Sequence, residues 1–215
     1  MYLPAHFKES RPEVLHTLLR THPLGLLVTQ DSAHDANGLQ ADAIPFMLDA
    51  ERGEFGTLVA HVARANPLWR EARTDVESLV VFQGPQAYVS PAWYPTKQET
   101  GKVVPTWNYV MVEARGRLRV FDDAAWVHAL VTRLTDHHEG ARTDAPRTPW
   151  KVTDAPDDYI ASMQRAIVGI EIELTALNGK WKVSQNRSPA DRAGVAAGLG
   201  ERAMAALVDP KGTPA

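Results

Sequence analysis

The stretch from Thr106 to Phe121 constrains the fold of this chain more than any other segment. From Tyr109 to Arg119 every second position carries a long side chain, and the positions between them are mainly Val, Ala or Leu. A period of two is the pattern of a half-buried β-strand. The sequence therefore predicts one long strand over 106–121.

Shorter stretches of strand character occur along the rest of the chain. They lie at 24–29, 39–48, 55–62, 78–90, 167–174 and 179–184, the fourth with a sharp break at Gly84-Pro85. Pro45 lies inside the second stretch and implies an edge strand or a bulge, because proline donates no ladder hydrogen bond. We count about seven strands, most of them consecutive.

Helices are predicted at intervals, from capping residues and apolar positions at helical spacing. They lie at 11–22, 68–74, 122–138, 154–164 and 188–208, with polar loops at 31–38, 96–102 and 139–153. Strands and helices do not alternate strictly, and no Gly-x-Gly-x-x-Gly motif occurs. This favours an α+β fold, a mostly antiparallel β-barrel with added helices, over a Rossmann sheet. We expect a single domain over 1–215 with a C-terminal helix at about 188–208, followed by a frayed tail at 210–215.

Composition narrows the function classes. The chain has no cysteine, which excludes disulfides, cysteine–zinc sites and cysteine nucleophiles. It has no run of about 18 apolar residues that would span a membrane, and its start lacks the basic and apolar regions of a secretory signal. We therefore expect a cytoplasmic protein without a membrane partner. The formal net charge is −3, whereas a dedicated nucleic-acid binder usually carries a basic excess.

Three polar clusters lie where predicted strands begin or end, at 61–67, 103–109 and 180–187. Their candidate binding residues are His61, Arg64 and Asn66 in the first, Thr106, Trp107 and Asn108 in the second, and Lys182, Gln185 and Asn186 in the third. We expect the three clusters to converge on one flat, anionic, aromatic ligand.

The first cluster has the chemistry of a phosphate site. Asn66-Pro67 is a typical helix start, and the N-terminus of a helix offers unpaired N–H groups and the positive end of its dipole. Arg64 adds a guanidinium that suits phosphate oxygens. The alternative is that Arg64 forms a surface salt bridge and Asn66 only caps the helix.

The second and third clusters have the chemistry of a planar heteroaromatic site. Trp107 offers stacking area, while Thr106 and Asn108 offer hydrogen bonds to a ring edge. Lys182 and Gln185 could bind a polar edge in the same way. The alternatives are an aromatic pair in a core or interface for Trp107, and local helix capping for the third cluster.

Two further groups carry weaker signals. Arg115, Arg117 and Arg119 alternate on one strand face and form the only basic stripe, which could meet phosphates or be a solvated strand face. His137-His138 could bind a metal, but histidines at the end of a helix more often face solvent. We predict no metal site.

Five blocks in the same order resemble the PaiB-type, FMN-binding negative transcriptional regulators. They are Met1-Tyr2-Leu3-Pro4-Ala5-His6-Phe7, the cluster at 61–67, the block at 82–94 that includes Gly84-Pro85 and Trp93-Tyr94, Val104-Pro105-Thr106-Trp107-Asn108-Tyr109, and Lys182-Val183-Ser184-Gln185-Asn186-Arg187. The resemblance covers nearly the whole chain. Two positions depart from the family pattern, which commonly has Gly in place of Ala60 and His in place of Gln86.

The resemblance implies an FMN-binding split barrel of the flavin-reductase and pyridoxamine-phosphate-oxidase type, in a homodimer that holds FMN between subunits. It implies that Arg64, His61 and Asn66 grip the phosphate and that Trp107 and Asn108 lie beside the isoalloxazine. Ile44 and Pro45 would offer backbone to the ring edge, and the third cluster would come from the partner subunit. The implied role is a flavin-binding repressor. The sequence has no recognisable helix-turn-helix, but a dimer could present two copies of the arginine stripe at 115–119 to DNA. The alternative is an FMN-dependent oxidoreductase of the NAD(P)H:flavin type, or a haem-binding relative.

Overall fold

The structure is a computed structural model, and it describes residues 1–31, 38–143 and 148–208. Most of the loop predicted at 31–38, the middle of the loop predicted at 139–153 and the predicted tail at 210–215 lie outside these residues. The chain divides into two compact units. The first unit comprises residues 1–18, 82–113 and 178–215, and the second comprises 19–81 and 114–177. Each is described by itself below.

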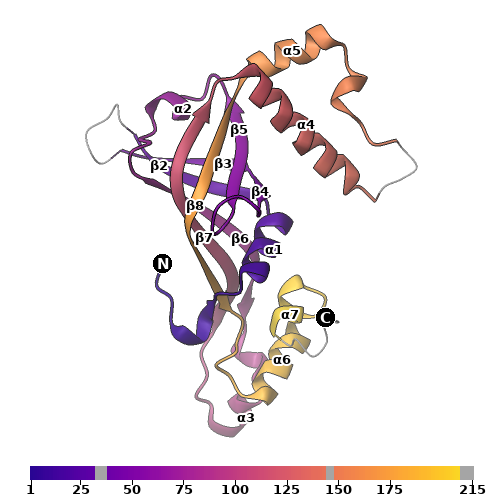
Figure 1. The fold of residues 1–215 in the computed structure, drawn as a ribbon. Coiled ribbons are helices and arrows are strands. Elements are labelled where there is room, and N and C mark those ends of the chain that lie inside the picture. The colour runs from indigo at the N-terminus through magenta and orange to yellow at the C-terminus, as the bar shows by residue number, and fades with distance from the viewer. Residues whose placement is uncertain (32–37, 144–147, 209–215) are drawn as a thin grey trace. The chain divides into compact units, whose positions relative to one another are not determined.

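The described residues form eight strands in one antiparallel sheet that is not closed (Figure 1). The strands are β1 (Lys8–Glu9), β2 (Leu24–Gln30), β3 (Leu39–Pro45), β4 (Met47–Asp49), β5 (Thr57–Ala63), β6 (Glu77–Val89), β7 (Thr106–Phe121) and β8 (Ile167–Lys182). Their order is β3-β2-β6-β7-β8-β5-β4, and β1 pairs with β8. The prediction of a mostly antiparallel α+β fold is confirmed, and β7 has the predicted bounds.

The first unit contains the N-terminal segment and the C-terminal helices. Its helical elements are η1 (Ala5–Phe7), most of α1 (Pro12–Thr21), η2 (Pro91–Trp93), α3 (Thr96–Thr100), α6 (Pro189–Leu199) and α7 (Ala203–Val208). The helix predicted at 188–208 is divided at Gly200, where φ is +61°. Helices α6 and α7 pack side by side (Figure 1). Trp93 of η2 lies against α6 at Gly198, where an added Cβ would come within 2.3 Å of the indole.

The second unit buries β5 and β8 beneath helices. Its helical elements are α2 (Leu68–Glu71), α4 (Ala124–Gly140), η3 (Val152–Asp154) and α5 (Asp157–Arg165). The side chains of Leu58, Ile170 and Ile172 are fully or almost fully buried. Trp126 of α4 stacks on Phe121 with ring centroids 4.4 Å apart. These contacts fix the start of α4 against the sheet.

The predicted break at Gly84-Pro85 and the predicted gap at 175–178 are both wrong, and Gly84 and Gly179 are sites of close packing. Strand β6 continues through Gly84, where a Cβ would come within 2.6 Å of both Leu18 Cδ1 and Val110 Cγ2. Strand β8 continues through Gly179, where a Cβ would come within 2.3 Å of Leu15 Cδ2. The strands predicted at 167–174 and 179–184 are therefore one strand.

The segment predicted as a loop at 96–102 contains the short helix α3. The buried Asp191 of α6 accepts hydrogen bonds from Thr96 N (3.1 Å) and Thr96 Oγ1 (2.9 Å), so its carboxylate satisfies the helix start from elsewhere in the chain. Gly101, at φ +66°, ends the helix. Sequence proximity alone could not reveal this cap.

Glu171 of β8 is a buried carboxylate in the second unit, 1% exposed. Arg52 Nη2 lies 3.1 Å from its Oε2, and Arg119 Nη1 lies 3.1 Å from its Oε1. A buried charge is tolerated when it is paired and hydrogen-bonded. Glu171 therefore connects β8 both to Arg119 of β7 and to Arg52 in the turn before β5.

We expect the Glu171→Gln substitution to lower the free energy of unfolding by about 2 kcal/mol, because it leaves two guanidinium groups without their carboxylate. Urea denaturation followed by circular dichroism measures the change. Glu173→Gln is the matched control, since Glu173 lies two residues later on the same strand and is exposed. Equal stability of the two variants would contradict a stabilising role for the Arg52–Glu171–Arg119 cluster.

Candidate functional site

In the first unit, the beginning of β7 and the end of β8 bring two of the predicted clusters together. Lys182 Nζ donates to Thr106 Oγ1 (2.6 Å) and to the Trp107 carbonyl oxygen (2.7 Å). Burial lowers the pKa of Lys182, and the neighbouring Lys180 and Arg187 act in the same direction. The cluster therefore holds a partly desolvated ammonium beside the backbone of Trp107.

Asn108 is fully buried in this cluster, and its Nδ2 donates to Ser184 Oγ at 2.8 Å. Ser184 has a φ of +64°, the left-handed region that residues other than glycine seldom adopt. Such a backbone costs about 1 kcal/mol or more and persists where surrounding contacts enforce it. The turn after β8 is thus held in one conformation, with Ser184 as its anchor.

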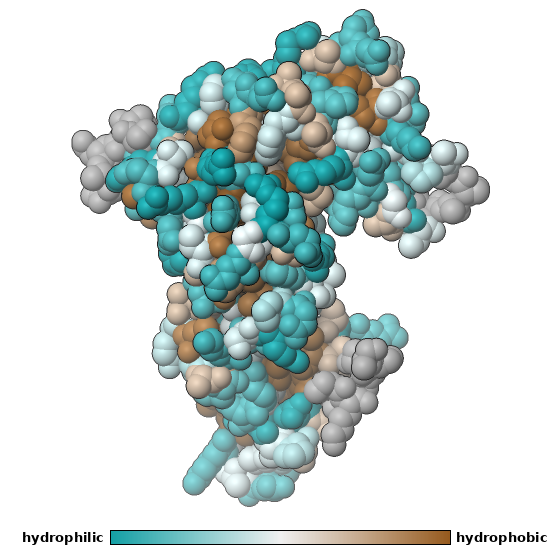
Figure 2. Space-filling model, in the orientation of Figure 1, coloured by the Kyte–Doolittle hydropathy of each residue, from teal (hydrophilic) through white to brown (hydrophobic). Residues whose placement is uncertain are grey.

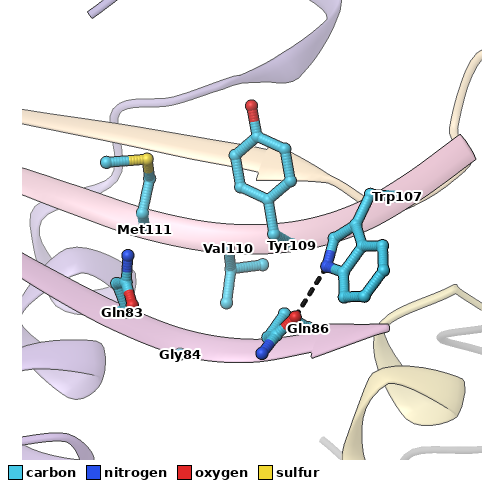
Figure 3. A pocket seen from close by; sticks show the side chains of 7 residues that line it. All are labelled: Gln83, Gly84, Gln86, Trp107, Tyr109, Val110 and Met111. Carbon is cyan, nitrogen blue, oxygen red and sulfur yellow. Dashed lines mark hydrogen bonds between the residues drawn. The ribbon is translucent and has the colours of Figure 1, made fainter. Parts of the chain in front are cut away.

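The Trp107 side chain is 48% exposed and points toward the neighbouring strand β6. Its Nε1 donates to Gln86 Oε1 at 2.6 Å, the contact drawn in Figure 3. Tyr88 of β6 lies edge-on to the indole, with ring centroids 6.1 Å apart. Trp107 and Gln86 form one end of a cavity of about 350 Å³, whose other lining residues are Gln83, Gly84, Tyr109, Val110 and Met111. The arrangement presents an oriented aromatic ring at the surface.

Gln185 and Asn186 of the third cluster form no hydrogen bond with the first or second cluster among the described residues. Gln185 bonds back to its own turn: its Oε1 accepts from Val183 N (2.8 Å) and its Nε2 donates to the Trp181 carbonyl oxygen. Asn186 is exposed. For these two residues the local alternative describes the geometry, and their predicted contact with a ligand stays a prediction.

In the second unit, Arg64 follows β5 and forms a bidentate ion pair with Asp122. Its Nη1 and Nη2 lie 2.9 Å and 2.6 Å from the two carboxylate oxygens, and its Nε donates to the Arg165 carbonyl oxygen at 2.6 Å. Each partner stabilises the charge of the other, so the pKa of Asp122 is lowered and the pKa of Arg64 is raised. The surface salt bridge stated as the alternative for Arg64 is therefore present, with Asp122 as a partner that the sequence did not identify, and a phosphate bound to the same face of the guanidinium would displace that carboxylate.

Asn66 caps α2 and also ties it to β3. Its Oδ1 accepts from Leu68 N (2.9 Å), and its Nδ2 donates to Asp42 Oδ1 (2.8 Å). The other oxygen of Asp42, Oδ2, is buried and has no hydrogen-bond partner among the described residues. Asp42 lies two residues before Ile44 and was also missed. A buried acceptor without a partner marks this corner as one where a further donor would be favourable.

Ile44 and Pro45 end β3, which lies at one end of the strand order, as the edge position predicted for Pro45 requires. Ile44 is buried and Pro45 is exposed. Pro45 belongs to an apolar surface on the β2–β3 hairpin, which we call the β2–β3 face. It consists of Leu24, Leu26, Val28, Leu39, Ala41, Ala43 and Pro45, whose positions alternate with more buried ones. Six of the seven pair with one another across the hairpin, and Leu39 pairs with Gln30. Leu24 and Leu39 are 62% and 73% exposed, which is unusual for leucine.

His61 of β5 lies in a different cavity from Arg64. Its imidazole lines a space formed with residues of α4, η3 and α5, and its Nδ1 is buried without a partner among the described residues. Burial lowers the pKa of His61, so the ring is neutral at pH 7. The predicted grouping of His61 with Arg64 around one phosphate stays a prediction.

The weaker candidates of the sequence gain no support. Arg119 of the arginine stripe is paired with Glu171, and its guanidinium lies 5.4 Å from the Phe121 ring centroid. His137 and His138 are exposed at the end of α4. Within the part of the chain that the structure describes, no three His, Cys, Asp or Glu side chains are placed to hold a metal ion. None of the helices in that part has the length and apolar character needed to cross a membrane.

Comparison with known proteins identifies relatives along most of the chain. The profile of the family described as "Putative FMN-binding domain" matches residues 1–176. An uncharacterised protein of Emericella nidulans is 35% identical, over 93% of this chain and 90% of its own length. The protease synthase and sporulation protein PAI 2 of Bacillus subtilis is 27% identical, over 89% of this chain and 85% of its own length. The resemblance stated from the sequence is therefore confirmed.

Among solved structures, the flavocytochrome Anf3 of Azotobacter vinelandii has a TM-score of 0.55 and 13% identity, covering 81% of this chain and 69% of that protein. At this identity the likeness shows the fold alone. It confirms the predicted split-barrel fold.

Proposed function

The chain belongs to the FMN-binding domain family, and from this membership we propose that it is a flavoprotein that binds FMN and works as a homodimer. The role that the resemblance implies is regulation of transcription. The observation that carries the proposal within the structure is the Arg64 corner of the second unit. There the guanidinium of Arg64 follows β5, and Asn66 ties the start of α2 to Asp42 of β3, the strand that carries part of the exposed apolar face.

The chemistry of the residues fits the parts of FMN. The phosphate is an anion, and Arg64 offers a planar guanidinium of the kind that binds phosphate oxygens in pairs. At the start of α2 the N–H of Leu68 already donates to Asn66 Oδ1, so Arg64 is the group that offers hydrogen bonds to the phosphate. In the first unit, Trp107 offers an exposed ring for stacking, and Lys182 offers positive charge near a reducible ring. The two parts of the proposal are tested separately, each within its own unit.

The ion pair between Arg64 and Asp122 provides a direct test of whether Arg64 binds the phosphate. Asp122 already occupies the geometry that a phosphate would take on Arg64. If Arg64 binds the phosphate, Asp122 competes with it, and removing the carboxylate strengthens binding. If Arg64 is only structural, removing Asp122 leaves FMN affinity unchanged.

The β2–β3 face supports the homodimer. A contiguous apolar strand surface at the end of a sheet favours burial against another protein surface, because water contact with it is costly and an open edge invites pairing. A second copy of the same chain offers an identical face, and a twofold contact joins like to like. The face ends at Pro45, next to the buried Ile44, so FMN held between subunits would lie at its margin.

A second candidate function is an FMN-dependent oxidoreductase. The observation that favours it is the engagement of Arg119 with Glu171, which removes one of the three arginines that would present positive charge to DNA. A bound flavin would supply hydride and electron transfer, and the protein would supply orientation and local charge. Lys182, held beside Trp107, is the residue whose charge would favour a reduced, anionic ring.

We expect the purified protein to show a flavin absorption spectrum and to bind added FMN. The Arg64→Ala variant should bind FMN roughly tenfold to a hundredfold more weakly, because it loses the charge-assisted hydrogen bonds to the phosphate. Asp122→Asn should bind it several-fold more tightly, and Arg117→Ala, which removes an exposed arginine of the same unit, should bind it normally. Quenching of FMN fluorescence on titration measures each affinity. A colourless protein that ignores FMN would overturn the flavin proposal; unchanged affinity in Arg64→Ala would overturn only the phosphate assignment.

We expect the protein to sediment as a dimer and the Leu26→Glu variant to dissociate at least about tenfold more readily. A carboxylate in the middle of the β2–β3 face would lose its hydration in a buried contact. Sedimentation velocity over a range of concentrations measures the change. Val104→Glu is the control, since Val104 is 65% exposed on the first unit. A monomeric wild type, or a Leu26→Glu dimer as stable as that of the control, would contradict the use of this face.

Two assays on the FMN-loaded protein distinguish the two candidate roles. The regulatory role predicts a gel shift with the DNA upstream of its own gene, at stated salt, that weakens in Arg117→Ala. The oxidoreductase role predicts FMN-dependent oxidation of NADH or NADPH that is reduced in Lys182→Met and unchanged in Arg117→Ala. A haem titration monitored at the Soret band provides the comparison for a haem-binding relative. Each role fails if its own assay is negative while FMN is bound.

A further inference from the structure

A second cavity in the second unit is separate in chemistry from the Arg64 corner. It has a volume of about 350 Å³ and lies where α4, η3 and α5 cover β5. Its principal lining residues are His61, Val131, Thr135, Trp150, Ile160 and Met163. None of the described residues that line it is an Asp, Glu, Lys or Arg. The cavity therefore suits a neutral molecule and is unsuited to a phosphate.

The rim of this cavity is apolar and open to solvent. Trp150 is 43% exposed and Met163 is 46% exposed. Figure 2 shows apolar surface where α4 and α5 meet. Large apolar side chains that remain exposed around a cavity gain free energy when a ligand covers them.

One buried polar atom at the cavity lacks a hydrogen-bond partner among the described residues. His61 Nδ1 is buried, and no described residue hydrogen-bonds to it. The nearby Gln164, which also lines the cavity, lies with Nε2 2.9 Å from His128 Nδ1. A buried imidazole nitrogen without a partner costs free energy that a ligand hydrogen bond would recover. Because burial lowers the pKa of His61, the ring is neutral at pH 7 and offers one donor and one acceptor.

We propose that this cavity binds a small, neutral, ring-containing alcohol or phenol, with its hydroxyl hydrogen-bonded to His61 and its ring against Trp150 and Met163. A hydroxyl both donates and accepts, so it satisfies either tautomer of His61. The volume is sufficient for about two fused rings. This site is independent of the flavin proposal, and it gives the His61 side chain a different ligand from the phosphate that the family resemblance implies.

Three matched probes test the chemistry: 2-naphthol, 2-methylnaphthalene and 2-naphthoate. We expect 2-naphthol to bind the purified protein. 2-Methylnaphthalene should bind about tenfold more weakly because it cannot form the hydrogen bond, and 2-naphthoate about tenfold more weakly because it is charged. Isothermal titration calorimetry gives the affinities. Perturbed amide signals of α4 and α5 in ¹H–¹⁵N NMR spectra identify the site. Absence of 2-naphthol binding, or perturbation confined to other elements, overturns the proposal.

Three variants test the residues. His61→Phe should reduce the preference for 2-naphthol over 2-methylnaphthalene to about twofold or less, since it removes the hydrogen bond and keeps a ring. Ile160→Trp should fill the cavity and abolish binding of all three probes. His138→Phe, at an exposed position near the end of α4, should leave every affinity unchanged. Thermal denaturation confirms that each variant is folded.

FMN content measured on the same variants separates this proposal from the one for flavin. Normal FMN binding by His61→Phe, with its preference for 2-naphthol lost, supports the neutral-ligand site. Loss of FMN binding in His61→Phe with an unchanged preference for 2-naphthol would place His61 in the phosphate grip and overturn the inference.

Discussion

The continuity of the long strands β6, β7 and β8 is the constraint on which the other features depend. Gly84 and Gly179 make it possible, because a side chain at either position would collide with Leu18 or Leu15 of α1 or with the adjacent strand. With β8 intact, its last residue reaches Thr106 and the Trp107 carbonyl oxygen at the beginning of β7. Close backbone packing thus positions the polar end of the sheet.

The polar residues at strand ends are fixed mainly by partners that are distant in sequence. Ser184 holds Asn108, Gln86 holds Trp107, Asp42 holds Asn66, and Asp122 holds Arg64. Each pairing leaves a functional group oriented before any ligand arrives, which reduces the entropy that binding must overcome. The Arg64 pair differs from the others, because its partner occupies the guanidinium face that an anion would need. If the phosphate of FMN binds there as proposed, it competes with the carboxylate of Asp122 for the same guanidinium.

The sequence predicts local features well and distant ones poorly. The alternation over 106–121 predicts β7 with its bounds, and the Pro12 and Asp123 signals predict α1 and α4 closely, because period and capping are local properties. The reading of Gly84-Pro85 as a break failed because a glycine needed for close approach looks the same in sequence as one needed for a turn. Asp42 and Asp122 escaped notice for a similar reason. Each is an ordinary surface-type residue whose importance lies in a partner 24 or 58 positions away.

His61 shows how one strand can serve two environments. Its neighbours Ala60 and Val62 are buried, while His61 itself faces the helices that cover β5. Three residues later, Arg64 has left the strand and meets Asp122 beside the start of α4. Both cavities include Gln164 and Ile167, yet one contains an ion pair, and the other has no Asp, Glu, Lys or Arg among its described lining residues. Within the same cluster of sequence, the end of the strand therefore divides a charged environment from a neutral one. Adjacent residues of a motif need not share a ligand, and the direction in which each side chain leaves the backbone decides which chemistry it serves.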